Sequence, residues 1–185
     1  MLGSNFIVSQ ETDASILVDF YCGLQRMDDY IHDGNLQRFI DNNPCHFYVI
    51  KDDEEIVAMF VISKGHLELD EDCKDDLKMK FPDIDKSPIS KMLWDQCIFP
   101  SIEIDYLAVR EGNRCSNKHI GSFAIKEIMT HWTEPEYENP LFLSVDAYRT
   151  PSYSAVRFYE KCQFWASEFP NPNIDTLRMF RIIDS

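Results

Sequence analysis

The sequence predicts an α/β protein in which helices pack against one central sheet. Its 185 residues suit one medium domain, which we expect to span residues 1–185. Hydrophobic residues make up 44% of the chain and aromatic residues 13%, so a substantial core can be buried. The C-terminal half alternates strand-like and helix-like patterns in the order β-loop-α-β-α-β-β, which is typical of one sheet with helices packed on it.

The N-terminal half combines a short strand pattern, helical patterns and a hairpin. Met27, Tyr30 and Ile31 recur at helical spacing, and this helix should end before Pro44, because a residue that precedes proline is pushed out of the α region. Two runs rich in strand-forming residues are joined by four acidic residues and predict a β-hairpin. The expected elements are a strand at 5–9, helices at 13–20 and 27–41, and strands at 46–51 and 56–63.

Residues 64–100 differ in character, and we interpret them as an acidic insertion between strands. Eight acidic and three basic residues lie between Glu68 and Asp85. They lack the ordered oxygen spacing and the central glycine of an EF-hand loop, so the pattern favours a solvated acidic surface and no metal site. Helix is expected at 72–80 and 90–94.

The remaining segments have the clearest patterns. Residues 102–109 alternate and then become apolar, as a strand does when it enters a core. A polar loop at 110–119 precedes an apolar stripe at helical spacing over 120–132. The last expected elements are a strand at 141–147, a helix at 152–161, and strands at 164–169 and 176–183.

Composition restricts the classes of partner. The formal net charge of −14 argues against a general nucleic-acid binder and against binding to an anionic membrane surface. The six cysteines are scattered without a CxxC pair, which favours buried or incidental thiols in a reducing compartment. The N-terminus has no signal-peptide pattern and no apolar run is long enough to span a bilayer, so we expect a cytoplasmic protein.

The loop at 110–119 has features of an anion site. A loop that enters a helix N-terminus presents unpaired backbone N–H groups and the positive end of the helix dipole. Four basic residues and one acidic residue lie between Arg110 and Lys126, a local charge of +3, and Gly121 permits close approach of a phosphate. These features alone fit an ordinary turn with solvated cations better than a binding site. The nucleotide motifs with the patterns GxxxxGK[ST] and GxGxxG are absent.

Longer motifs resemble a known family. The run Ile104-Asp-Tyr-Leu-Ala-Val, followed by Asn117-Lys-His-Ile-Gly-Ser and an apolar helix, resembles the acetyl-CoA signature of the GNAT acetyltransferase superfamily. Ala155-Val-Arg-Phe-Tyr-Glu-Lys-Cys-Gln-Phe resembles the family's helix motif Ala-x-x-Phe-Tyr-Glu-Lys-x-Gly-Phe. Upstream, Phe20-Tyr-Cys-Gly and Met27-Asp-Asp-Tyr-Ile are similar to the branch that contains the GNAT-type toxins. The resemblance implies a single mixed, mostly antiparallel sheet flanked by helices.

The resemblance also implies direct transfer of an acetyl group from acetyl-CoA to a primary amine in a ternary complex. Tyr159 matches the tyrosine that protonates the departing thiolate, although a buried helix aromatic is the alternative interpretation. Glu103, or else Asp105, is the candidate base, although strand carboxylates are often only solvent-facing. The residues expected to bind the coenzyme are Leu107, Ala108, Val109, Arg114, Asn117, Lys118, His119, Ile120, Gly121, Ser122 and Ser152.

Three departures from the family pattern affect this expectation. Ser116 and His119 stand where the family's loop has Gln or Arg and its first glycine, and Gln163 stands where its helix motif has glycine. Two alternatives remain. The upstream resemblance supports a toxin, paired with an antitoxin, that acetylates aminoacyl-tRNA, and the departures support a non-catalytic acetyl-CoA-binding module. The negative charge favours a cationic acceptor over nucleic acid. We expect no membrane partner. The oligomeric state is left open, and a homodimer is one alternative.

Overall fold

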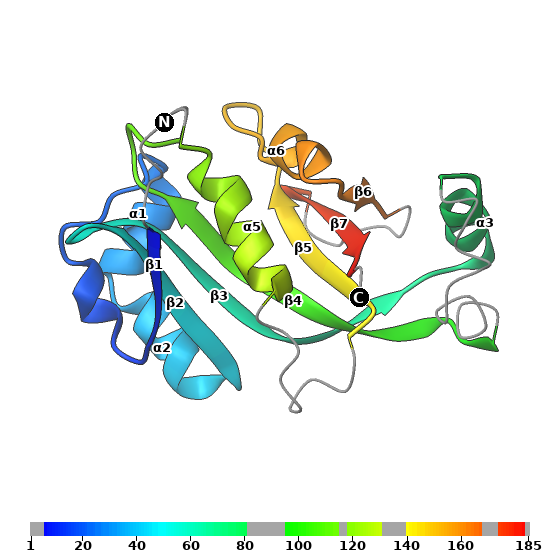
Figure 1. The fold of residues 1–185 in the computed structure, drawn as a ribbon, viewed down its shortest axis with the longest axis horizontal. Coiled ribbons are helices and arrows are strands. Elements are labelled where there is room, and N and C mark those ends of the chain that lie inside the picture. The colour runs from blue at the N-terminus through cyan, green and yellow to red at the C-terminus, as the bar shows by residue number, and fades with distance from the viewer. Residues whose placement is uncertain (1–5, 81–94, 115–117, 131–139, 168–173, 184–185) are drawn as a thin grey trace. The chain divides into compact units, whose positions relative to one another are not determined.

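The computed structural model describes residues 6–80, 95–114, 118–130, 140–167 and 174–183. Their strands form a seven-stranded sheet in the order β1-β2-β3-β4-β5-β7-β6, with helices beside it, which confirms the predicted fold class (Figure 1). The strands are β1 (Phe6–Glu11), β2 (Cys45–Asp52), β3 (Glu55–Glu68), β4 (Ile98–Val109), β5 (Phe142–Tyr148), β6 (Trp165–Ala166) and β7 (Thr176–Ile182). The helices are α1 (Gln25–His32), α2 (Asn35–Asn42), α3 (Glu71–Lys80), α5 (Ile120–Thr130) and α6 (Val156–Lys161), with a short 3-10 helix at Ala14–Leu17.

The chain divides into two compact units. Unit 1 comprises Met1–Ser63 and Ile104–Trp132, and unit 2 comprises Lys64–Glu103 and Thr133–Ser185. The long strands β3 and β4 each contribute residues to both units. The expectation of a single domain over 1–185 stays a prediction.

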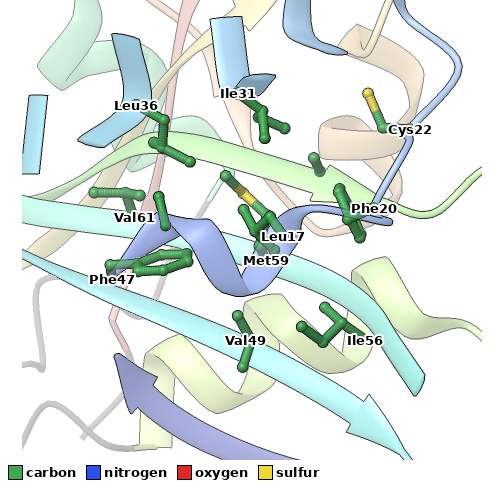
Figure 2. Packing of buried hydrophobic residues seen from close by; sticks show 12 residues of the cluster. Leu17, Phe20, Cys22, Ile31, Leu36, Phe47, Val49, Ile56, Met59 and Val61 are labelled. Carbon is green, nitrogen blue, oxygen red and sulfur yellow. The ribbon is translucent and has the colours of Figure 1, made fainter. Parts of the chain in front are cut away.

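Unit 1 is built around an antiparallel three-element layer, β1-β2 and the first part of β3. The predicted hairpin is confirmed: β2 pairs with β3, and Asp53 turns the chain with a φ of 55°. The core lies where the 3-10 helix, α1 and α2 cover β2 and β3, and Figure 2 shows their side chains gathered there. This core includes Leu17, Phe20, Ile31, Leu36, Phe47, Val49, Met59, Val61 and Ala108.

Unit 2 contains the antiparallel pair β5 and β7, which lie side by side in Figure 1, with β6 paired to the other side of β7. Its core contains side chains from the end of β3, from α3 and from the sheet. The ring of Phe142 packs edge to face against those of Phe99 and Phe180, with centroids 5.5 and 5.8 Å apart. The segment interpreted as an acidic insertion therefore supplies part of this core. The helix expected at 72–80 is present as α3, and the one expected at 90–94 lies outside the described residues.

Three expectations about elements were wrong in detail. The single helix expected at 27–41 is two helices, because Gly34 adopts a φ of 75° between them. The helix expected at 13–20 is one 3-10 turn. The helix expected at 152–161 begins only at Val156, because Arg149 first forms a β-bridge with Ser154.

Within the described residues, no helix is long and apolar enough to cross a membrane.

Candidate active site

The loop after β4 is anchored in unit 1 by Arg110. Its backbone N–H donates to the carbonyl of Val57 at 2.9 Å, and its guanidinium donates to the carbonyls of Ile56 and Asp19, each at 2.7 Å. The guanidinium also lies over the ring of Phe20, 5.4 Å from its centroid. Arg110 therefore serves to fix the loop and is less available to a ligand.

The entry to α5 has a left-handed backbone at His119, where the sequence motif places the first loop glycine of the family it resembles. His119 adopts a φ of 52°, and its carbonyl accepts the N–H of Phe123 at 2.9 Å, which starts the helix. Ile120 is buried, Gly121 is half-buried and Ser122 is exposed. The first N–H groups of a helix have no partner within it and attract anions through the helix dipole.

The other residues expected to bind the coenzyme are distributed over both units. In unit 1, Ala108 is buried at the end of β4, between half-buried Leu107 and Val109, and Arg114 is exposed. In unit 2, Ser152 is exposed and its hydroxyl lies 3.3 Å from that of Thr150. Asn117 lies outside the described residues, together with Cys115 and Ser116.

The local positive charge expected around this loop is offset by the β2–β3 turn. Lys118 forms an ion pair with Asp52, and Arg110 forms one with Glu55 at 3.2 Å. The hydrogen bond to Asp52 raises the pKa of Lys118, and the charges of Asp52, Asp53 and Glu55 add to it. The expected charge of +3 therefore does not describe this surface, because three acidic side chains from a turn some 60 residues earlier act on it.

In unit 2, Glu103 is held by two side chains from neighbouring strands. Arg178 on β7 donates to both carboxylate oxygens of Glu103, at 2.5 and 2.6 Å, and the buried hydroxyl of Ser144 on β5 donates to Oε2 at 2.8 Å. Burial alone lowers the pKa of Arg178, but its bonds to Glu103 and the charges of Glu103 and Asp146 raise it overall. Glu103 is thus a fixed, charge-paired carboxylate.

Close packing on β3 maintains this arrangement. A Cβ on Gly65 would lie 3.0 Å from Ser101 Oγ and 3.1 Å from Glu103 Cβ. A carboxylate has about four lone-pair positions. The three hydrogen bonds to Glu103 leave about one of these free, and it lies on Oε1.

Sequence reasoning missed Arg178 altogether. The available signal was an arginine that interrupts the apolar run Leu177-Arg-Met-Phe180 of a predicted strand.

Tyr159 lies buried on α6, with its ring against Phe158 at 5.0 Å and Phe164 at 5.2 Å. Burial raises its pKa, and the charges of Tyr153, Cys162 and Glu103 add to that rise. Among the described residues, the hydroxyl of Tyr159 makes no hydrogen bond. The raised pKa keeps this phenol protonated at neutral pH.

The end of α6 fixes the position of Tyr159. The N–H of Gln163 donates to Glu160 at 3.0 Å and that of Phe164 donates to Tyr159, also at 3.0 Å. These are the two bonds of a Schellman motif, whose left-handed position is usually glycine. Gln163 occupies that position with a φ of 66°. Both positions where glycine is missing from the family pattern, His119 and Gln163, therefore keep a glycine-like backbone.

Other chemistries find little support. The described cysteines, Cys22, Cys45, Cys73, Cys97 and Cys162, form no disulfide, and burial raises the pKa of Cys22 to about 11. Within the part of the chain that the structure describes, no group of three or more His, Cys, Asp or Glu side chains could hold a metal ion.

Comparison with known proteins identifies the fold. No protein-family model matches the chain, and no curated protein matches it significantly. Among solved structures, a Tyr-to-Phe mutant of the toxin AtaT, bound to acetyl-CoA and the C-terminus of the antitoxin AtaR, has a TM-score of 0.63 at 14% identity. The match covers 97% of this chain and 94% of that one.

Two further structures are similar over comparable lengths. AtaT complexed with acetyl-methionyl-tRNAfMet has a TM-score of 0.63 at 15% identity and covers 94% of each chain. The KacTA–DNA complex has a TM-score of 0.62 at 14% identity and covers 97% of this chain and 94% of that one. At these identities the similarity shows the fold: this chain has the GNAT fold of those toxins, as its motifs predicted.

Proposed function

We propose that the protein is an acetyl-CoA-dependent N-acetyltransferase that transfers an acetyl group directly to a primary amine. The observation that carries this proposal is Tyr159, which is buried, protonated and without a hydrogen-bond partner among the described residues. Its position on α6 is fixed by the Schellman motif and by Phe164. A phenol held in this way suits the protonation of a leaving thiolate.

The proposed reaction forms one bond and breaks one. The amine nitrogen attacks the thioester carbonyl, the carbon–sulfur bond breaks, and Tyr159 donates its proton to the coenzyme A thiolate. The proton that the amine nitrogen loses passes to water or to a carboxylate, and a proton from water restores the phenol of Tyr159. Glu103 keeps its proposed place near the amine, but its bidentate pair with Arg178 makes it better suited to attract an ammonium group than to carry a proton away.

Coenzyme binding is assigned mainly to backbone groups in unit 1. The N–H groups of residues 117–122 bind the pyrophosphate, and the backbone of Leu107, Ala108 and Val109 binds the pantetheine arm. This assignment is robust to the loss of the first loop glycine, because His119 keeps the left-handed backbone. Arg114 and Lys118 add positive side chains, and Ser152 in unit 2 stays a candidate contact.

The acceptor has two candidates. The net charge of −14 favours a cationic amine, such as a polyamine or a lysine-rich tail. The alternative, a toxin that acetylates aminoacyl-tRNA, is favoured by the likeness to AtaT complexed with acetyl-methionyl-tRNAfMet. The AtaT structure weakens our expectation that nucleic acid is not a partner, because AtaT is complexed there with acetyl-methionyl-tRNAfMet.

A comparison of two phenylalanine variants tests the proposal. Tyr159→Phe should reduce turnover by about 100-fold, the size of one acid–base contribution, and leave acetyl-CoA affinity within about twofold. Tyr48→Phe, which removes a hydroxyl from a half-buried tyrosine stacked on Phe60, is the matched control and should leave turnover unchanged. Acetylation of an amine panel and of charged tRNA is measured with each variant.

The outcomes separate the candidate functions. Acetylated tRNA together with growth arrest on expression supports the toxin, and acetylated amines alone support the cationic acceptor. Binding of acetyl-CoA without turnover on any acceptor supports the non-catalytic module. Equal turnover by the wild type and Tyr159→Phe contradicts the role assigned to Tyr159.

A further inference from the structure

The turn between β2 and β3 consists of four acidic residues, Asp52 to Glu55, and it contacts both ends of the loop that precedes α5. Glu55 pairs with Arg110 at the start of the loop, and Asp52 pairs with Lys118 at its end. Unit 1 thus brings a concentrated negative charge to the segment to which phosphate binding is assigned.

We propose that Asp52 competes with the phosphates of acetyl-CoA for Lys118 and thereby lowers the affinity of the coenzyme site. The inference rests on the proposed function, because it concerns the same loop. Carboxylate and phosphate oxygens accept the same ammonium protons, and a lysine presents them as a point charge that can turn from one acceptor to another.

The two cations of the loop differ in their freedom to change partners. Arg110 is committed to two backbone carbonyls as well as to Glu55. Lys118 has Asp52 as its partner, and 47% of its side chain is exposed against 18% for Asp52. Lys118 is therefore the member of the pair that moves, while Asp52 stays at the end of β2.

An exposed ion pair of this kind contributes little to stability, so a ligand can displace it readily. Its effect on binding is nevertheless direct, because each phosphate that takes Lys118 must first separate it from Asp52. Asp53 and Glu55 also act on Lys118 electrostatically, and they repel an incoming phosphate in the same way.

Calorimetric titration of acetyl-CoA into the full chain tests the proposal. Asp52→Asn should increase the affinity about threefold, which lies within the range of about 1.4-fold to fivefold for an exposed pair. Glu54→Gln is the matched control, since Glu54 carries the same charge in the same turn but is exposed and makes no ion pair among the described residues. It should change the affinity by less than about 1.5-fold.

A double-mutant cycle then separates competition from general repulsion. In a Lys118→Met background, Asp52→Asn should lose its effect on affinity, because the ion pair is already absent. An undiminished gain in that background overturns the proposal in favour of simple charge repulsion. A weaker affinity of Asp52→Asn in the wild-type background also overturns it, since the pair then orders the loop for the ligand.

The same titrations distinguish this inference from the proposed function. If the wild type binds acetyl-CoA and Asp52→Asn binds it equally, the competition is wrong and the coenzyme site stands. If neither protein nor any variant binds acetyl-CoA, both are wrong. If Asp52→Asn binds acetyl-CoA and the wild type does not, the result supports both the competition and the coenzyme site, because release of Lys118 from Asp52 then allows the coenzyme to bind.

Discussion

Replacement of Gln163 by glycine should stabilise the protein, because this residue holds a left-handed backbone at the end of α6. A non-glycine residue in that region is disfavoured by about 1–2 kcal/mol, whereas glycine loses about 0.5–1 kcal/mol through the greater freedom of its unfolded chain. The side chain offers little compensation: its Oε1 accepts from Arg181 at 3.4 Å and is exposed. The expected net gain in the free energy of unfolding is about 0.5–1 kcal/mol.

Thermal and urea unfolding measure this gain. For a chain of this length the midpoint should rise by about 2–3 °C. Gln163→Ala is the matched control, because it removes the amide but keeps the Cβ that strains the backbone, and it should not be stabilised. The reasoning is refuted if Gln163→Gly melts no higher than Gln163→Ala. A rise in both variants would assign the effect to the amide.

Two further predictions concern unit 2. Gly65→Ala should destabilise the protein by about 1–3 kcal/mol, because its Cβ would press on Ser101 and Glu103; urea unfolding measures the loss, and an unchanged midpoint contradicts the close packing. Arg178→Met should destabilise the protein by about 2–3 kcal/mol. This loss is smaller than that from breaking a fully buried ion pair, because the side chains of Arg178 and Glu103 are both partly exposed. Arg178→Lys keeps the positive charge and should lose less stability than Arg178→Met. Equal stability of the two Arg178 variants would show that the charge on Glu103 needs no partner.

Much of the fold was predictable because its signals are local. The apolar stripe of α5, the alternation of β4 and the acidic turn of the hairpin each lie within one element, and each prediction was confirmed within a few residues. The break between α1 and α2 was missed because the apolar spacing continues across it. Gly34 interrupts the helix through its backbone conformation, which hydrophobic periodicity does not report.

The candidate site was predictable only where it follows a motif. Tyr159 belongs to a run that can be recognised by its spacing, whereas the pairing of Arg178 with Glu103 joins residues 75 positions apart. Nothing within β7 indicates which carboxylate its arginine contacts. The Schellman motif was hidden for a different reason: its usual marker is glycine, and the chain has Gln163 there.

The electrostatics of the coenzyme loop show why neighbours in sequence are a poor guide to local charge. Counting residues near Lys118 gives a positive loop, but the β2–β3 turn brings Asp52, Asp53 and Glu55 to it. A phosphate site built on side-chain cations would therefore be weak here. The N–H groups at the start of α5 are different, because their partial charge belongs to the backbone and forms no ion pair with a carboxylate. We therefore expect coenzyme affinity to depend more on the left-handed backbone at His119, which aims those groups, than on either cation of the loop.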